Sequence, residues 1–155
     1  MLFRSWPAAT RLALRTGAPV LAFPTREPGL RLDGRLRDGD AVVGSEFRLE
    51  ALHTPGHAPN HLCFRLEEER VLFTGDNVLD GMWSVISPER GGDMAEYLHS
   101  LERMRRLRTA WLAPGHGERI DDARARIDEY LAHRRDRERQ VLRALRREPA
   151  TVTEL

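Results

Sequence analysis

The chain has 155 residues, of which 41% are hydrophobic and 32% are charged, so it carries enough apolar material for one ordinary domain with a buried core. Its 25 basic residues, all of them arginine, stand against 24 acidic residues and leave a formal net charge of +1, which argues neither for nor against a nucleic-acid partner. The absence of lysine excludes Schiff-base and P-loop lysine chemistry, and the single cysteine, Cys63, excludes an internal disulfide framework.

Compartment signals are few. No apolar run approaches the roughly 20 residues that a membrane-spanning helix needs, and the N-terminus lacks the order of charged, apolar and small residues that marks a signal peptide. A lone cysteine fits a reducing environment. We therefore expect a cytoplasmic protein with no membrane partner.

The first predicted elements are a helix and a short strand. The pattern of residues predicts a helix over Trp6–Thr16, with Gly17 as its stop signal. Pro19–Phe23 is a continuous apolar run, which predicts a strand covered on both faces in a layered α/β fold. Pro28-Gly29 then breaks the chain. Because a lone helix and a buried strand have nothing before them to pack against, we expect the N-terminal strands of the domain to be missing.

The next segment, Leu30–Gly75, has the pattern of an antiparallel meander. Apolar residues alternate with polar ones over Phe47–His53 and again over Leu62–Leu66. After an acidic turn, Val71–Thr74 forms a further apolar run that ends at glycine. We expect these segments to be neighbouring strands of one sheet.

The C-terminal half is predicted to be mostly helical. Leucines and methionines recur at helical spacing over Met94–Arg108. Trp111–Ala113 predicts a short strand, and a long Arg-rich helix is expected from Asp121 onward.

The last residues carry helix signals of their own. Pro149 stops a helix, and Thr151–Glu154 has the capping-box form that starts another. We expect two units, an α/β domain over residues 1–120 and a helical element over residues 121–155.

Three side chains that can bind metals are expected just beyond strand ends. His57 and His116 each follow Pro-Gly after a predicted strand, and Asp76 follows Gly75 after another. Prolines and glycine argue strongly against a helix over His53–His61. Loops at the carboxyl ends of strands are where layered α/β proteins place their sites.

The residue types suit a metal centre. Imidazole and carboxylate bind Zn²⁺ while leaving a position for water, and a bound divalent ion lowers the pKa of that water from 15.7 towards roughly 7. A carboxylate between two ions can bridge them. The alternative remains that His57 and His116 are turn residues and that Asp76 caps a turn or a helix. His53 and His61 are assigned to supporting or packing roles.

Three motifs resemble those of a known family. Thr54–His61, Leu72–Asp76 and Ala113–Gly117 look like the third, fourth and fifth motifs of the metallo-β-lactamase superfamily of hydrolases. The tail from Pro114 to Leu142 looks like the branch that contains β-lactamase-like protein 2 and glyoxalase II-like proteins. The resemblance covers nearly all of the chain.

This resemblance implies an αββα sandwich followed by a winged-helix-like C-terminal element, here with the first strands and the end of that element missing. It also implies two zinc ions in a complete member, with His57 on the first, Asp76 bridging both and His116 on the second. His53, Asn60 and His61 would support these ligands or face the substrate.

The upstream H-x-H-x-D-H motif of the family is absent, because the first histidine of the chain is His53. Each ion would keep one histidine and a shared carboxylate, whereas a catalytic zinc has three protein ligands. We therefore expect weak or no metal binding and little hydrolysis by this chain alone. The implied reaction is attack by metal-bound hydroxide on an ester, thioester, lactam or phosphodiester. The missing strands would leave apolar sheet edges exposed, which favours self-association.

Two other interpretations remain open. Residues 124–147 carry nine arginines against four acids, so the C-terminal helix could instead serve a non-enzymatic RNA- or protein-binding module. Against this stands a solvated helix face with acid–base pairs. The chain could also be a half-protein that assembles with a partner supplying the absent strands.

Overall fold

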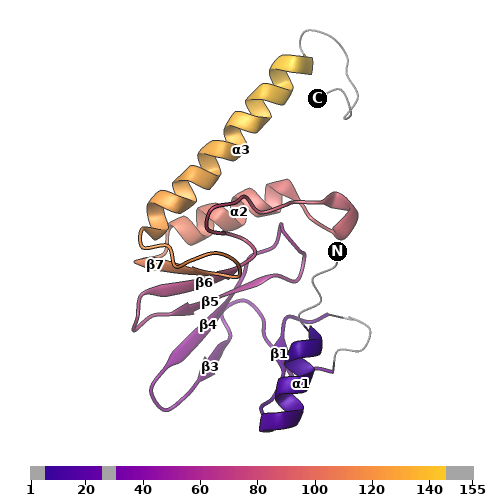
Figure 1. The fold of residues 1–155 in the computed structure, drawn as a ribbon, viewed down its shortest axis with the longest axis vertical. Coiled ribbons are helices and arrows are strands. Elements are labelled where there is room, and N and C mark those ends of the chain that lie inside the picture. The colour runs from indigo at the N-terminus through magenta and orange to yellow at the C-terminus, as the bar shows by residue number, and fades with distance from the viewer. Residues whose placement is uncertain (1–5, 26–30, 146–155) are drawn as a thin grey trace.

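The computed structural model describes residues 6–25 and 31–145. The Pro28-Gly29 break, Pro149 and the Thr151–Glu154 capping box lie outside the described residues. The elements run in the following order (Figure 1): α1 (Trp6–Thr16), β1 (Leu21–Ala22), β2 (Gly34–Arg35), β3 (Ala41–Val43), β4 (Arg48–His53), β5 (Leu62–Leu66), β6 (Val71–Gly75), a short 3-10 turn (Pro88–Arg90), α2 (Met94–Arg105), β7 (Trp111–Pro114) and α3 (Ala123–Leu145).

A five-stranded sheet is the centre of the fold. Its strand order is β3-β4-β5-β6-β7, with antiparallel pairing from β3 to β6 and parallel pairing between β6 and β7. The predicted meander and the predicted strand after α2 are therefore confirmed. Parallel pairing brings the carboxyl ends of β6 and β7 to the same edge of the sheet.

One face of the sheet is packed against α2 and α3. The core combines Leu52, Cys63, Leu72 and Leu112 from the strands with Tyr97, Leu101 and Met104 from α2 and Ile127, Tyr130 and Leu131 from α3. Asp93 caps α2, because its side chain accepts a hydrogen bond from the Glu96 N–H. The buried residues of α3 all precede residue 132, and the rest of that helix projects beyond the sheet (Figure 1).

The opposite face of the sheet is apolar and incompletely covered. Phe64 and Phe73 are paired across β5 and β6 on this face, and Phe73 is 41% exposed. Exposed apolar surface favours self-association, which the sequence predicts from the edges of the sheet and not from this face.

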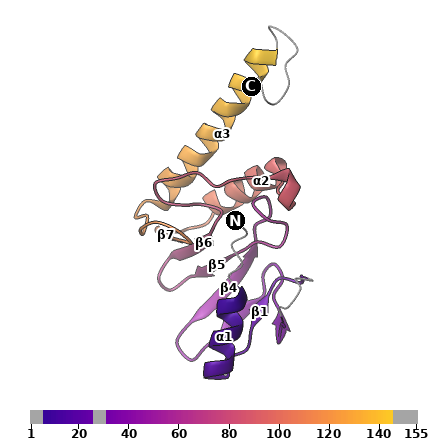
Figure 2. The same cartoon turned by 45° about the vertical axis from the view of Figure 1, so that its right-hand side comes forward.

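The N-terminal segment departs from the expected layer. Helix α1 has the predicted bounds, but its Leu12 and Leu14 are 61% and 83% exposed. β1 is only two half-buried residues and pairs with β2 in a separate two-stranded sheet (Figure 2). The prediction of a strand covered on both faces is therefore wrong, because this run does not enter the five-stranded sheet.

The sheet with its two helices is one half of the expected sandwich, an α/β arrangement without a second large sheet in the described part of the chain. No winged helix is seen in residues 31–145, where α3 is a single continuous helix. The division at residue 120 stays a prediction. No helix among the described residues is both long and apolar enough to cross a membrane.

Candidate metal centre

His57 is positioned by the loop that follows β4. Gly56 has a φ of +126°, and a Cβ there would lie 2.3 Å from the Tyr97 Cα, so only glycine lets the loop approach α2 so closely. The Gly56 carbonyl accepts a hydrogen bond from the Asp93 N–H at 2.9 Å. The Ser100 hydroxyl donates to the Pro55 carbonyl at 2.7 Å. The loop is thus fixed to the start of α2.

Asp76 follows the end of β6 and is held through its neighbour. Asn77 is fully buried and donates from its side chain to the Thr54 carbonyl at 2.9 Å. The Tyr97 hydroxyl donates to the Asn77 carbonyl at 2.6 Å. Burial raises the pKa of Tyr97, so this hydroxyl stays a donor at neutral pH.

His116 follows the end of β7, at the same sheet edge. The Gly115 N–H donates to the Gly75 carbonyl at 2.8 Å. A Cβ at Gly115 would lie 3.0 Å from Asp76 Oδ1, so glycine lets the two loops meet beside the carboxylate.

The structure brings His57, Asp76 and His116 together. His57 Nε2 lies 3.7 Å from Asp76 Oδ2, and His116 Nε2 lies 3.5 Å from Asp76 Oδ1. The three side chains are partly exposed. Each oxygen of one carboxylate therefore faces a different imidazole, which is the arrangement of a carboxylate shared between two sites.

In the neutral form of His57, the lone pair of Nε2 faces the Asp76 carboxylate. His57 Nδ1 lies 2.8 Å from the Val85 carbonyl oxygen, which can only accept, so Nδ1 carries the proton of the neutral ring. Nε2 is then unprotonated and available to a metal. The Ser84 hydroxyl lies 3.3 Å from the same Nδ1.

The nitrogen–oxygen distances suit zinc ligands, but the number of ligands is too small. Two ligands bound to one tetrahedral zinc at about 2.0–2.2 Å lie about 3.3–3.6 Å apart, close to both observed nitrogen–oxygen distances. Within residues 6–25 and 31–145, however, no group of three or more His, Cys, Asp or Glu side chains is placed to hold a metal ion. If Asp76 were shared, each of the two positions would have two protein ligands, one fewer than a catalytic zinc site normally uses.

His61, one of the residues expected to support the ligands, contacts His57. His61 is packed edge-on to His57 at 6.2 Å between ring centroids, and its Nδ1 lies 3.0 Å from the Thr54 hydroxyl. Burial, together with the positive charge that His57 can carry, lowers the pKa of His61 to about 4. His61 is therefore neutral at pH 7.

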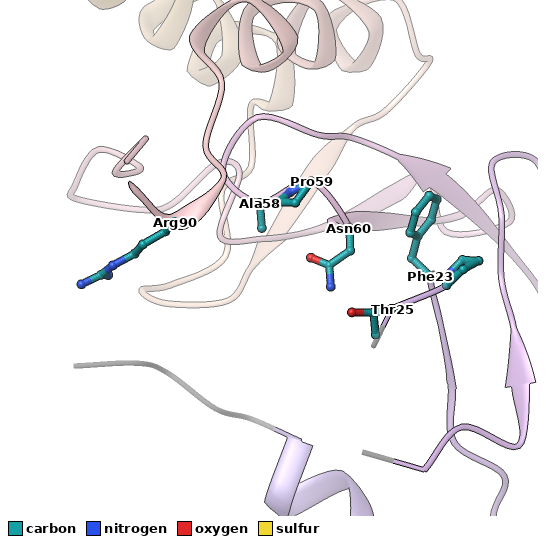
Figure 3. A pocket seen from close by; sticks show the side chains of 7 residues that line it. Phe23, Thr25, Ala58, Pro59, Asn60 and Arg90 are labelled. Atoms are coloured by element: carbon teal, nitrogen blue, oxygen red, sulfur yellow. The ribbon is translucent and has the colours of Figure 1, made fainter. Parts of the chain in front are cut away.

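His53 and Asn60 have partners outside this cluster. The His53 ring stacks on Phe23 at 4.2 Å, and its Nε2 lies 2.9 Å from the Pro59 carbonyl oxygen. Asn60 lines an open cavity of about 430 Å³ together with Phe23, Pro24, Thr25, Ala58, Pro59 and Arg90. In Figure 3 the Asn60 amide faces Thr25, and the Arg90 side chain extends away from both.

The arginines of α3 are largely engaged within the molecule. Ion pairs join Arg124 to Asp128, Arg126 to Glu129, Arg135 to Glu102 and Arg139 to Asp136. This arrangement favours the solvated acid–base face over a surface dedicated to RNA.

Sequence reasoning missed the Ser84–Val85 contact with His57. A main-chain carbonyl carries no residue-type signature, so no pattern could have found it. Asn77 could have been found from the sequence, because it directly follows Asp76, a predicted ligand.

Comparison with known proteins decides the family. The sequence profile of the metallo-beta-lactamase superfamily matches residues 3–116. This chain belongs to the metallo-beta-lactamase superfamily. The match covers His57, Asp76 and His116 and ends before α3.

Relatives within the superfamily are longer than this chain. Lactamase-like protein adaB of Aspergillus niger is 47% identical over 118 residues, which are 76% of this chain and 36% of that protein. Lactamase-like protein aptB of Emericella nidulans is 43% identical over 107 residues, which are 66% of this chain and 33% of that protein. The chain thus spans about a third of the length of these curated relatives.

Solved metallo-beta-lactamase structures show the same fold. The metallo-beta-lactamase family protein TTHA1429 of Thermus thermophilus is 31% identical, with a TM-score of 0.70 over 92% of this chain and 50% of that one. A beta-lactamase domain protein of Burkholderia ambifaria is also 31% identical, with a TM-score of 0.65 over 78% of this chain and 38% of that one. The described fold is therefore partial relative to its relatives.

Proposed function

We propose that this chain carries the C-terminal part of the catalytic centre of a zinc-dependent hydrolase. The observation that carries the proposal is the placement of Asp76, whose two oxygens face His57 Nε2 and His116 Nε2 at 3.7 and 3.5 Å. Membership of the metallo-beta-lactamase superfamily supports it. The substrate class is an ester, thioester, lactam or phosphodiester, on a small molecule or an RNA.

The geometry supports the roles that we propose for the three residues. His57 and His116 would each hold one of two zinc ions, and Asp76 would be shared by both. A bound divalent ion supplies Lewis acidity and lowers the pKa of its water to about 7. The chain's own contribution is to fix these ligands on rigid strand ends, with the Val85 carbonyl holding the His57 ring in the tautomer that presents Nε2.

The donor set limits the activity of this chain by itself. Two protein ligands for each ion are fewer than the three of a catalytic zinc site, so we propose weak zinc binding and slow turnover. Placement in the branch that contains β-lactamase-like protein 2 and glyoxalase II-like proteins, with a winged-helix-like end, stays a prediction, because α3 is described only to Leu145.

Metal-dependent turnover tests this function. A panel of chromogenic thioester, ester, β-lactam and phosphodiester substrates is assayed with and without added zinc, for the wild type, Asp76→Asn and Asp121→Asn. Asp121 is the matched control, since it is 82% exposed and pairs with Arg119. We expect slow zinc-dependent turnover of at least one substrate that Asp76→Asn abolishes and Asp121→Asn retains. Turnover that is unchanged in Asp76→Asn would contradict the proposal.

A further inference from the structure

One face of α3 is bonded to the loop of residues 79–85. Arg126, Tyr130 and Arg134 are spaced four residues apart, so they lie on one side of the helix. All three donate hydrogen bonds to main-chain carbonyls of this loop. The family profile ends at residue 116, so the helix that makes these contacts lies outside the segment on which family membership rests.

Arg126 and Tyr130 both bond to Leu79 and Met82, and Arg134 bonds further along the loop. Arg126 Nη2 donates to the Leu79 carbonyl at 2.9 Å and to the Met82 carbonyl at 3.1 Å. The Tyr130 hydroxyl accepts from the Leu79 N–H at 2.9 Å and donates to the Met82 carbonyl at 2.8 Å. Arg134 donates from Nη2 to the Ser84 carbonyl.

Aromatic packing adds a second attachment of the same loop to α3. The Trp83 ring stacks on His133 at 4.0 Å with an interplanar angle of 4°, and it meets Tyr130 edge-on at 4.8 Å. The side chain of Arg126 is only 17% exposed, and Tyr130 is fully buried. The bonds from the two arginines are charge-assisted and therefore stronger than bonds between neutral groups, so the loop is held firmly.

The loop ends on His57. Residue 85 directly follows the residue that Arg134 holds, and the Val85 carbonyl accepts from His57 Nδ1 at 2.8 Å. The Ser84 hydroxyl lies 3.3 Å from the same nitrogen. A displacement of the loop would therefore release the imidazole from the tautomer in which Nε2 faces Asp76.

We infer that Arg126, Tyr130 and Arg134 are positioning residues, which act through loop 79–85 to fix the orientation and tautomer of His57. Their hydrogen bonds to main-chain atoms end on the loop, and the loop in turn bonds to the imidazole. The inference rests on the proposed function, because the orientation of the His57 ring affects activity only where His57 binds a metal.

The test reads the His57 ring directly in the metal-free protein. Nitrogen-15 chemical shifts of the imidazole distinguish the two tautomers, and the His57 signal is assigned by its loss in His57→Gln. We compare Arg134→Met with Arg139→Met, a matched control on the same helix whose side chain is 62% exposed and paired with Asp136. Tyr130→Phe keeps the ring and removes only the hydroxyl, so it decides the question if Arg134→Met does not fold.

We expect the wild type and Arg139→Met to show the Nδ1-protonated ring, and Arg134→Met and Tyr130→Phe to show a mixture of both tautomers. Zinc affinity, measured by competition with a chromophoric chelator, should fall roughly tenfold to a hundredfold in the same two variants. A folded Arg134→Met and Tyr130→Phe with the wild-type tautomer would overturn the inference. If the wild type bound no zinc, the proposed function would fail, whereas the tautomer comparison would still decide the positioning role.

Discussion

At the scale of single residues, the candidate centre depends on how closely two loops approach their neighbours. Gly56 brings the His57 loop against the backbone of α2, and Gly115 brings the His116 loop beside Asp76. The conformation at Gly56, with φ at +126°, is one that L-residues rarely adopt. The candidate metal ligands are thus placed by residues that have no side chain.

Gly56→Ala should destabilise the fold strongly. The new methyl would both overlap the Tyr97 backbone and force alanine into a strained conformation, so we expect a loss of more than about 3 kcal/mol in the free energy of unfolding. Gly39→Ala is the control, because Gly39 also has a positive φ but open space around it, and about 1 kcal/mol is expected there. Urea unfolding measures both, and equal losses would contradict the steric argument.

His61 should make the fold sensitive to mild acid. Its pKa is lowered by burial to about 4 in the folded state, against 6.5 for the ordinary group. The folded state therefore binds fewer protons than the unfolded state between these values, and stability falls as pH drops from about 6.5 to about 4.

The full effect is of the order of 3 kcal/mol. His61→Gln should remove that part of the pH dependence in urea unfolding carried out from pH 7 to pH 4. His99→Gln, on α2, is the control variant and should keep it. A His61→Gln variant with the wild-type slope would show that His61 does not titrate as described.

At the scale of elements, sequence patterns predicted those helices and strands whose formation depends on neighbouring residues. The α1 bounds, the β4–β5–β6 meander and β7 followed from helical spacing, alternation and turn residues. The place of β1 did not follow, because an apolar run does not reveal which sheet it joins. The attachment of α3 to the loop of residues 79–85 was also out of reach, since Arg134 and Ser84 are 50 residues apart in the chain.

The incompletely covered face of the sheet should cause self-association. Phe73 is 41% exposed on that face, and exposed apolar surface favours contact between copies. We expect Phe73→Lys to lower concentration-dependent association in sedimentation velocity. Leu142→Lys, at a 51% exposed site near the far end of α3, should leave association unchanged. A wild type that stays monomeric at all concentrations would refute this prediction.

At the scale of the whole molecule, the candidate centre is a convergence of three strand ends that lie far apart in the sequence. His57, Asp76 and His116 were predictable as candidates because each follows a strand. The sheet order explains how Asp76 meets His116, since β6 and β7 are parallel neighbours, whereas His57 reaches them from the loop after β4. Their role as metal ligands stays a prediction. The chain spans half of TTHA1429 and about a third of its curated relatives, so the activity of a complete protein is a proposal.

A zinc titration of the wild type and of Asp76→Asn measures whether the Asp76 carboxylate binds zinc. Asp76 faces both imidazoles, so its carboxylate would contribute to either proposed metal position, and amide substitution would remove that charge from both. We expect weak but measurable zinc binding by the wild type and at least about tenfold weaker binding by Asp76→Asn. Equal affinities in the two proteins, or no binding by the wild type at millimolar zinc, would contradict this expectation.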